Sequence, residues 1–152
     1  MSHVCKVDLE VLDLGCLEKA ANQLGLEFVR DQKTYRWYGH SFGDFPIPAG
    51  LTEADLGKCD HAIRIKGDKN TGTLRAYEVG VMKRRDGKPG YNLLWDFWAG
   101  GYGLRDRIGT DGNKLRQEYA VQVAIKHARA QGYRVSRQTK QDGSIVLKAV
   151  HS

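Results

Sequence analysis

Aromatic and basic side chains alternate in one short segment of the chain, Tyr-Arg-Trp-Tyr, at residues 35–38. In an extended backbone, successive side chains point to opposite sides, so Tyr35 and Trp37 share one side and Arg36 and Tyr38 the other. One pair is expected to pack in the core while the second is exposed. An exposed aromatic ring beside a basic side chain can stack on a nucleobase and neutralise phosphate, which is the chemistry of single-stranded nucleic-acid binding.

Further basic side chains share one side of two other predicted strands. Arg64 and Lys66 lie on one side of the first strand, and Arg134 and Lys140 lie on one side of the second, together with Ser136. If both strands belong to the same sheet, these residues form a polar, basic face that suits a phosphate-bearing ligand. The alternative is an ordinary solvated sheet face.

A glycine-rich run, Gly-Gly-Tyr-Gly at residues 100–103, leads toward a helix and is followed by Arg105 and Arg107. Its backbone amides could bind a phosphate, although the spacing fits neither the dinucleotide fingerprint nor the phosphate loop. The alternative is a flexible connection. The candidate ligand-binding residues are therefore Arg36, Trp37, Tyr38, Arg64, Lys66, Arg105, Arg107, Arg134 and Lys140.

Catalytic and metal-binding patterns find little support in the sequence. Cys59, Asp60 and His61 are consecutive, so in an extended segment they cannot converge on one metal ion. His3 and Cys5 share one side of a strand, but two ligands alone make a weak metal site. Serine-hydrolase, zinc-protease, paired-cysteine and kinase motifs are missing from the sequence. We therefore predict a protein that is not an enzyme, with no cofactor and no metal.

The charge is unevenly distributed over the 152 residues, whose formal net charge is +6. Residues 1–60 carry six basic and ten acidic side chains, residues 61–90 eight and three, and residues 91–152 ten and five. Such asymmetry favours an anionic partner, whereas a solvated basic surface is the plainer explanation.

Hydrophobic periodicity predicts an α+β fold in a single domain, 1–152. Helices are expected at 14–24, with Asp13 as its N-cap, and at 113–131; strands are expected at 4–11, 26–29, 35–38, 61–66, 74–83, 91–98, 133–140 and 144–150. Each half then follows the order βαββ, with a glycine ending each helix. We expect the two βαββ halves to form one mainly antiparallel sheet with the two helices on one face.

The second helix is expected to bury a stripe of alanine and other apolar side chains, Ala120, Val121, Ala124, Ile125 and Ala128. Its polar side would then face solvent with Glu118, Gln122, Lys126 and Arg129.

Several short motifs, in this order, resemble one known family over nearly the whole chain. They include Leu-Glu-Lys-Ala at 17–20, Tyr-Glu-Val-Gly-Val at 77–81, Asp96 with Trp98, and Gln-Glu-Tyr-Ala at 117–120. The family is the hypothetical chloroplast reading frame 35 family, a domain of unknown function with plastid, cyanobacterial, bacterial and phage members. The resemblance implies a compartment and a partner, an AAA-type ATPase, but no activity. The segments 39–58 and 100–108 differ from the plastid relatives.

The leading hypothesis is a non-catalytic binding module for a phosphate-bearing ligand, either single-stranded nucleic acid or a nucleotide. The alternatives are a protein-interaction subunit of an AAA-type ATPase system, and a phage protein that sequesters a nucleotide signal. No apolar run is long enough to span a membrane, and three unpaired cysteines fit a reducing compartment. The expected location is the cytoplasm, the plastid stroma for relatives, or the host cytoplasm for a phage protein. The sequence leaves the oligomeric state open.

Overall fold

The computed structural model of the chain describes residues 3–41, 43–67 and 76–151. Short 3-10 turns, η1 (Glu53–Asp55), η2 (Trp98–Gly103) and η3 (Thr110–Gly112), lie in the connections. The remaining elements are, in chain order, β1 (Val4–Val11), α1 (Leu14–Gln23), β2 (Leu26–Val29), β3 (His61–Ile65), β4 (Val79–Lys83), β5 (Tyr91–Asp96), α2 (Leu104–Ile108), α3 (Asn113–Ala130), β6 (Tyr133–Thr139) and β7 (Ile145–His151).

The main sheet has five antiparallel strands in the order β1-β5-β4-β3-β2. The predicted α+β class and antiparallel sheet are thereby confirmed. The strand predicted at 74–83 corresponds to β4, and residues 68–75, where this prediction begins, lie outside the described part of the chain.

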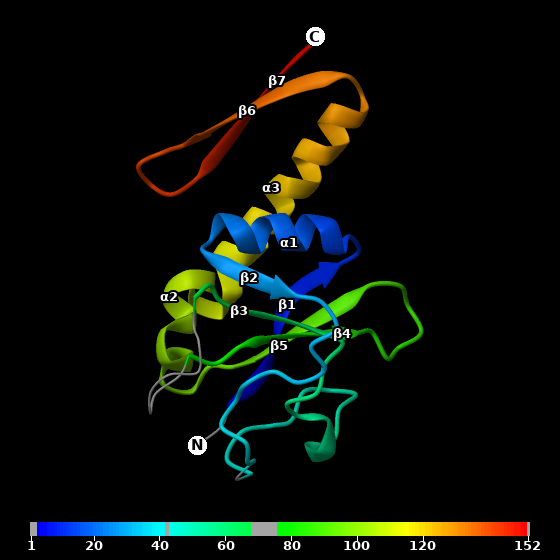
Figure 1. The fold of residues 1–152 in the computed structure, drawn as a ribbon, viewed down its shortest axis with the longest axis vertical. Helices are drawn as coiled ribbons and strands as arrows, with labels where there is room; N and C mark the ends of the chain where they lie inside the picture. The colour runs from blue at the N-terminus through cyan, green and yellow to red at the C-terminus, as the bar shows by residue number, and fades with distance from the viewer. Residues whose placement is uncertain (1–2, 42, 68–75, 152) are drawn as a thin grey trace.

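The prediction that both halves share one sheet is wrong, because β6 and β7 form a separate two-stranded sheet. Helix α3 explains the separation. Its 18 residues extend for about 27 Å at 1.5 Å per residue and carry the chain away from the main sheet before β6 begins. Figure 1 shows the hairpin at the end of the molecule where the chain ends, with the N-terminus at the opposite end.

The two long helices lie on the same face of the main sheet, as predicted. Leu17 of α1 and Leu115 of α3 belong to one buried cluster with Val81, Leu93 and Trp95 of the sheet. The strands contribute alternate residues to this cluster, because side chains along a strand point to opposite faces.

The other face of the main sheet is covered by the segment between β2 and β3, instead of being open. Tyr35 is 2% exposed and its ring lies directly on Gly80 of β4, where a Cβ atom would come within 2.3 Å of it. Leu56 and Cys59 are buried in the same cluster as Tyr35 and Leu94. The sheet therefore offers no continuous polar face to a ligand.

Two buried carboxylates hold this covering segment in place. Asp96 is 0% exposed and accepts hydrogen bonds from the backbone N–H groups of His3 (2.9 Å), Trp98 (3.0 Å) and Tyr38 (3.1 Å). Glu78 is 4% exposed and accepts one from the N–H of Arg36 (2.8 Å). The N–H groups of Arg36 and Tyr38 thus bond to side chains instead of a neighbouring strand, and the strand predicted at 35–38 does not form.

Replacing Asp96 with Asn is expected to destabilise the protein by about 2–3 kcal/mol, because an amide NH2 would then meet backbone donors that need an acceptor. Urea unfolding measures the change. Asp8→Asn is the matched control, since the Asp8 side chain is fully exposed and its loss should change stability by less than about 0.5 kcal/mol. Equal midpoints for the two variants would contradict the anchoring role of Asp96.

Candidate functional site

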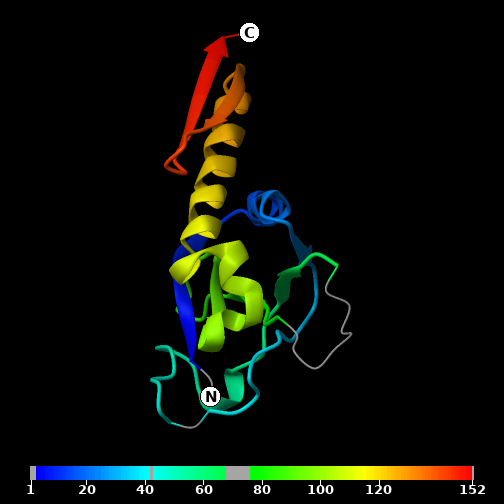
Figure 2. The ribbon, with the colours of Figure 1, turned by 90° about the vertical axis from the view of Figure 1, so that its left-hand side faces the viewer.

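The most prominent surface feature is an arm, defined as α3 together with the β6–β7 hairpin, residues 113–151. Figure 2 shows α3 rising out of the body of the molecule, with the hairpin packed alongside its C-terminal half. The hairpin runs back along the helix, so its turn lies near the base of α3, where the Gln117 side chain donates to the Gly143 carbonyl (3.2 Å).

An ion pair fastens the hairpin to the helix. Both terminal nitrogens of the Arg137 guanidinium donate hydrogen bonds to the Glu118 carboxylate, with Nη1 3.1 Å from Oε2. The Glu118 side chain is 6% exposed, and Gln122 donates to it at 3.4 Å. The bonds to Glu118 raise the pKa of Arg137.

This contact corrects the predicted faces of α3 in part: Val121 is buried and Lys126 and Arg129 are exposed, as expected, but four other residues are not where the sequence placed them. Glu118 and Gln122, expected in solvent, are buried, whereas Ala120 and Ala124, expected in the core, are exposed. The reason is that the hairpin supplies a cation for Glu118, so the hairpin covers the part of the polar side that holds Glu118 and Gln122.

The base of α3 is joined to the β1–α1 turn. The Tyr119 hydroxyl accepts hydrogen bonds from the backbone N–H groups of Leu12 (3.0 Å) and Asp13 (3.2 Å). Asp13 is the N-cap of α1, as predicted, and accepts from the Cys16 N–H at 3.0 Å. The same carboxylate pairs with Lys126 of α3, and these contacts lower the pKa of Asp13 to about 2, the Lys126 bond contributing most.

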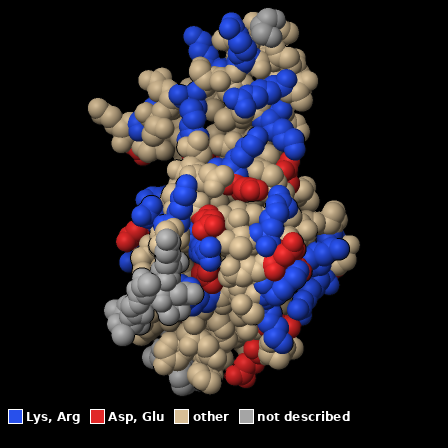
Figure 3. Space-filling view, in the orientation of Figure 1, with Lys and Arg blue, Asp and Glu red and all other residues tan. Residues whose placement is uncertain are grey.

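Residues 113–152, which comprise the arm and Ser152, account for the whole net charge of +6. Of the 24 Lys and Arg in the chain, eight lie in 113–152, whereas only two of the 18 Asp and Glu lie there. The remaining 16 basic and 16 acidic side chains of residues 1–112 cancel. Figure 3 shows this difference: blue side chains dominate the upper part of the surface, while red and blue are interspersed below.

The outward face of the hairpin combines cations with exposed valines. Arg134 lies opposite Val150, and Lys148 lies opposite Ser136. Val146 and Val150 are 41% and 44% exposed. Within the described part of the chain, five cations of the arm have no carboxylate partner: Lys114, whose ammonium donates to the Asp106 backbone carbonyl, and Arg129, Arg134, Lys140 and Lys148 farther along the arm.

The predicted basic sheet face does not exist as one surface. Arg134 and Lys140 lie in or next to β6 of the hairpin, whereas Arg64 lies in β3 and Lys66 just beyond it in the main sheet. In addition, Arg64 pairs with Glu27 at 3.1 Å.

The structure brings Lys66 and Arg107 together around Gly25. The Lys66 N–H donates to the Gly25 carbonyl (3.2 Å), and the Arg107 guanidinium packs on the same glycine. Arg105 packs against Gly100.

The glycine-rich run is a left-handed turn, with positive φ from Ala99 to Gly103. Gly100 and Gly101 are buried, the Gly100 N–H donates to Phe97, and the Gly101 carbonyl accepts from Tyr77. This hydrogen-bonded turn does not offer the open phosphate-binding loop considered from the sequence.

Of the alternation predicted for 35–38, only the ends follow the pattern: Tyr35 is buried and Tyr38 is 42% exposed, whereas Arg36 and Trp37 are both half-buried. Trp37 packs on Gly57, and the Arg36 guanidinium donates to the Ala76 carbonyl at 2.7 Å. These residues lie in the segment that covers the main sheet, separate from the hairpin.

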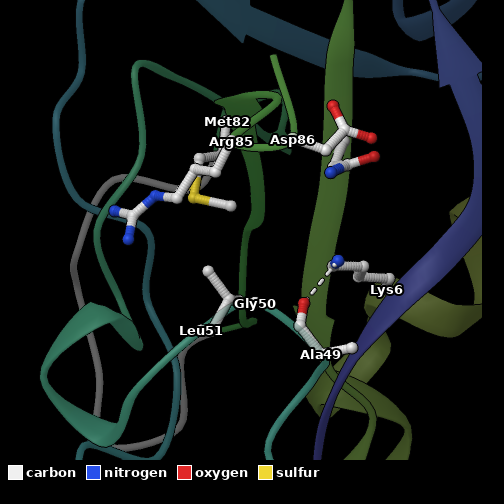
Figure 4. A pocket seen from close by; sticks show the side chains of 8 residues that line it. Lys6, Ala49, Gly50, Leu51, Met82, Arg85 and Asp86 are labelled. Atoms are coloured by element: carbon white, nitrogen blue, oxygen red, sulfur yellow. Dashed lines mark hydrogen bonds between the residues drawn. The ribbon is translucent and has the colours of Figure 1, made fainter. Parts of the chain in front are cut away.

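A small pocket of about 160 Å³ beside this segment has its charges already engaged (Figure 4). Lys6 donates to the Ala49 carbonyl at 2.8 Å, and Arg85 points away from Lys6 and pairs with Asp55 at 2.9 Å.

The cysteines are free thiols, Cys16 and Cys59 being buried. Burial is the main cause that raises the pKa of Cys59 to about 12, which disfavours the reactive thiolate. No group of three metal-ligating side chains occurs within 3–41, 43–67 and 76–151.

Residues 57–148 match the model of a family described as "Protein of unknown function (DUF1257)". The chain belongs to this family. The DUF1257 match includes both residues of the Glu118–Arg137 pair and both buried carboxylates, Glu78 and Asp96. Comparison with curated proteins and with solved structures gave no significant match. None of the described helices is long and apolar enough to cross a membrane.

Sequence reasoning missed Lys148 and Arg129 as members of the exposed basic surface. Lys148 is a single charged residue in an otherwise apolar stretch of predicted strand, and this signal could have identified its outward position. The role of Glu118 had no local signal, because its partner lies 19 residues away in a separate element.

The Glu118→Gln and Arg137→Gln variants are each expected to destabilise the hairpin by about 2–3 kcal/mol, below the full cost of a buried pair because Arg137 is 28% exposed. Hydrogen exchange should show faster exchange in β6 and β7 while the main sheet stays protected. Arg134→Gln, which removes an unpaired charge from the same strand, is the control. Unchanged exchange in both pair variants would show that the ion pair does not fasten the hairpin.

The cap formed by Asp13 is expected to fail in acid. The folded pKa of about 2 lies below the ordinary value of 3.8, so the contribution is present above pH 4 and is lost as the pH falls toward 2. Asp13→Asn should cost about 1 kcal/mol at pH 7, and the difference from the unmodified protein should shrink in that acid range. Urea unfolding at several pH values measures it; a difference that does not depend on pH would contradict this role.

Proposed function

We propose that the protein is a non-catalytic binding module that uses the arm to bind a phosphate-bearing polymer, single-stranded nucleic acid. The observation that carries this proposal is the charge division: the arm region holds a net charge of +6 and the rest of the chain is neutral. A polyanion is therefore attracted to one end of the molecule.

Counterion release supplies the binding energy in such an arrangement, because each neutralised phosphate frees a condensed cation. The unpaired cations of the arm can each bind a phosphate without first breaking an existing ion pair. The valines between them add apolar contact, to which a nucleobase or sugar is suited.

A second candidate function is docking on a protein partner, favoured by the exposed Val146 and Val150 on the hairpin. An AAA-type ATPase is the partner that the resemblance to the hypothetical chloroplast reading frame 35 family implies. If that finer family assignment holds, we also propose the cytoplasm, the plastid stroma or a phage-infected host as its location. Sequestration of a free nucleotide remains a third proposal.

Anisotropy titrations with a labelled single-stranded 20-mer at increasing salt test the proposal. With four phosphate contacts, the slope of log K against log salt is expected to be about −3. The Arg134→Gln/Lys148→Gln double variant should lose two contacts, reduce the magnitude of this slope by about 1.4 and bind roughly ten-fold more weakly.

Lys58→Gln/Lys83→Gln is the matched control, because it removes two exposed charges from the body. It should leave the affinity nearly unchanged. Equal losses in the two double variants would refute a site on the arm, and the absence of oligonucleotide binding at low salt would favour the protein-partner function.

A further inference from the structure

A groove of about 360 Å³ lies where the C-terminal end of α1, the middle of α3 and strand β6 meet. Its size falls within the range of small-ligand sites, about 300–1,000 Å³. Figure 1 shows α1 crossing α3 where the arm meets the body, with β6 farther along α3. The groove thus adjoins the basic surface without belonging to the outward face of the hairpin.

The groove is positively charged at its rim. Lys19 of α1 and Arg129 of α3 line it, and both side chains are exposed and lack a carboxylate partner within the described residues. The third cation, Arg137, is already neutralised by Glu118. An anionic group between α1 and α3 would therefore meet two available positive charges.

Carboxamides make up the rest of its polar lining. Asn22 and Gln23 of α1 are exposed, and their side chains make no hydrogen bond to another described residue. Gln122 of α3 is 9% exposed and donates to Glu118, which leaves its carbonyl oxygen as an acceptor. A carboxamide offers a donor and an acceptor side by side, which matches the edge of a nucleobase.

Apolar contact comes from the side chains of Ile125 and Val135, which are half-buried on opposite sides of the groove, in α3 and β6. They can contact a planar ring that enters between the helix and the strand. The groove therefore offers cations for a phosphate, carboxamides for the hydrogen-bonding edge of a base, and apolar side chains for the face of its ring.

We infer that this groove receives one unpaired nucleobase with its flanking phosphate, so that the protein selects single strands over duplexes. The inference rests on the proposed function and names its substrate class. In a duplex the base edges are paired and stacked, so they cannot enter the groove without unpairing, whereas the cations of the hairpin contact phosphates of either form.

The experiment compares three labelled 20-mers in anisotropy titrations: a single strand, its duplex, and a single strand with abasic positions throughout. The unmodified protein should bind the first at least ten-fold more tightly than the other two. Asn22→Ala/Gln23→Ala should weaken single-strand binding about ten-fold through the loss of two hydrogen bonds, and leave duplex and abasic binding unchanged. Since no charge is removed, the salt slope should not change.

Gln141→Ala, which removes an exposed carboxamide from the hairpin turn outside the groove, is the matched control and should bind all three as the unmodified protein does. Unfolding midpoints confirm that the variants are folded. Equal affinity for single strand and duplex, or unchanged single-strand binding by the Asn22/Gln23 variant, overturns the groove site while the role of the arm stands. If the unmodified protein binds none of the three oligonucleotides, both the groove site and the proposed function of the arm are overturned.

Discussion

The pairing of Glu118 with Arg137 is the interaction on which the arrangement of the arm depends. A two-stranded hairpin is marginally stable in water, so β6 and β7 need a surface on which to pack. The polar side of α3 provides it, because a buried carboxylate requires a cation and the hairpin brings one. The consequence is that the hairpin presents its alternate side chains, including Arg134 and Lys148, to solvent at a fixed orientation.

A pair of buried carboxylates, Glu78 and Asp96, keeps the main sheet of the body covered. Glu78 and Asp96 hold the backbone of 36–38 against the main sheet, and residues of 34–41 and 43–59 cover the face that the helices leave uncovered. Both faces of the sheet are therefore occupied. The exposed surface with an excess of positive charge lies on the arm instead, although most of the aromatic and basic candidates of the sequence lie in the body.

Local patterns predicted the local elements well. The strand at 4–11, the Asp13 cap and the last two strands, expected at 133–140 and 144–150, all depend on near neighbours, and the structure contains each of them. Contacts between elements that are far apart in the sequence could not be predicted from such local patterns. The identical order of elements in both halves predicts one sheet, but the length of α3 separates the hairpin from the main sheet. The burial of Glu118 on α3 could not be predicted, because its partner, Arg137, is not a sequence neighbour.

Helix α3 has neither glycine nor proline between Asn113 and Ala130, and it runs without interruption from the hydrophobic core to the hairpin. Such a helix is rigid and has no residue at which it would readily kink between the core and the hairpin. Anything that bound the hairpin would meet it in the orientation that the body sets, and the arm would lose little conformational entropy on binding. Mechanical load on the hairpin would likewise pass directly to Leu115 and Tyr119, so the arm could not be displaced without disturbing the hydrophobic core itself.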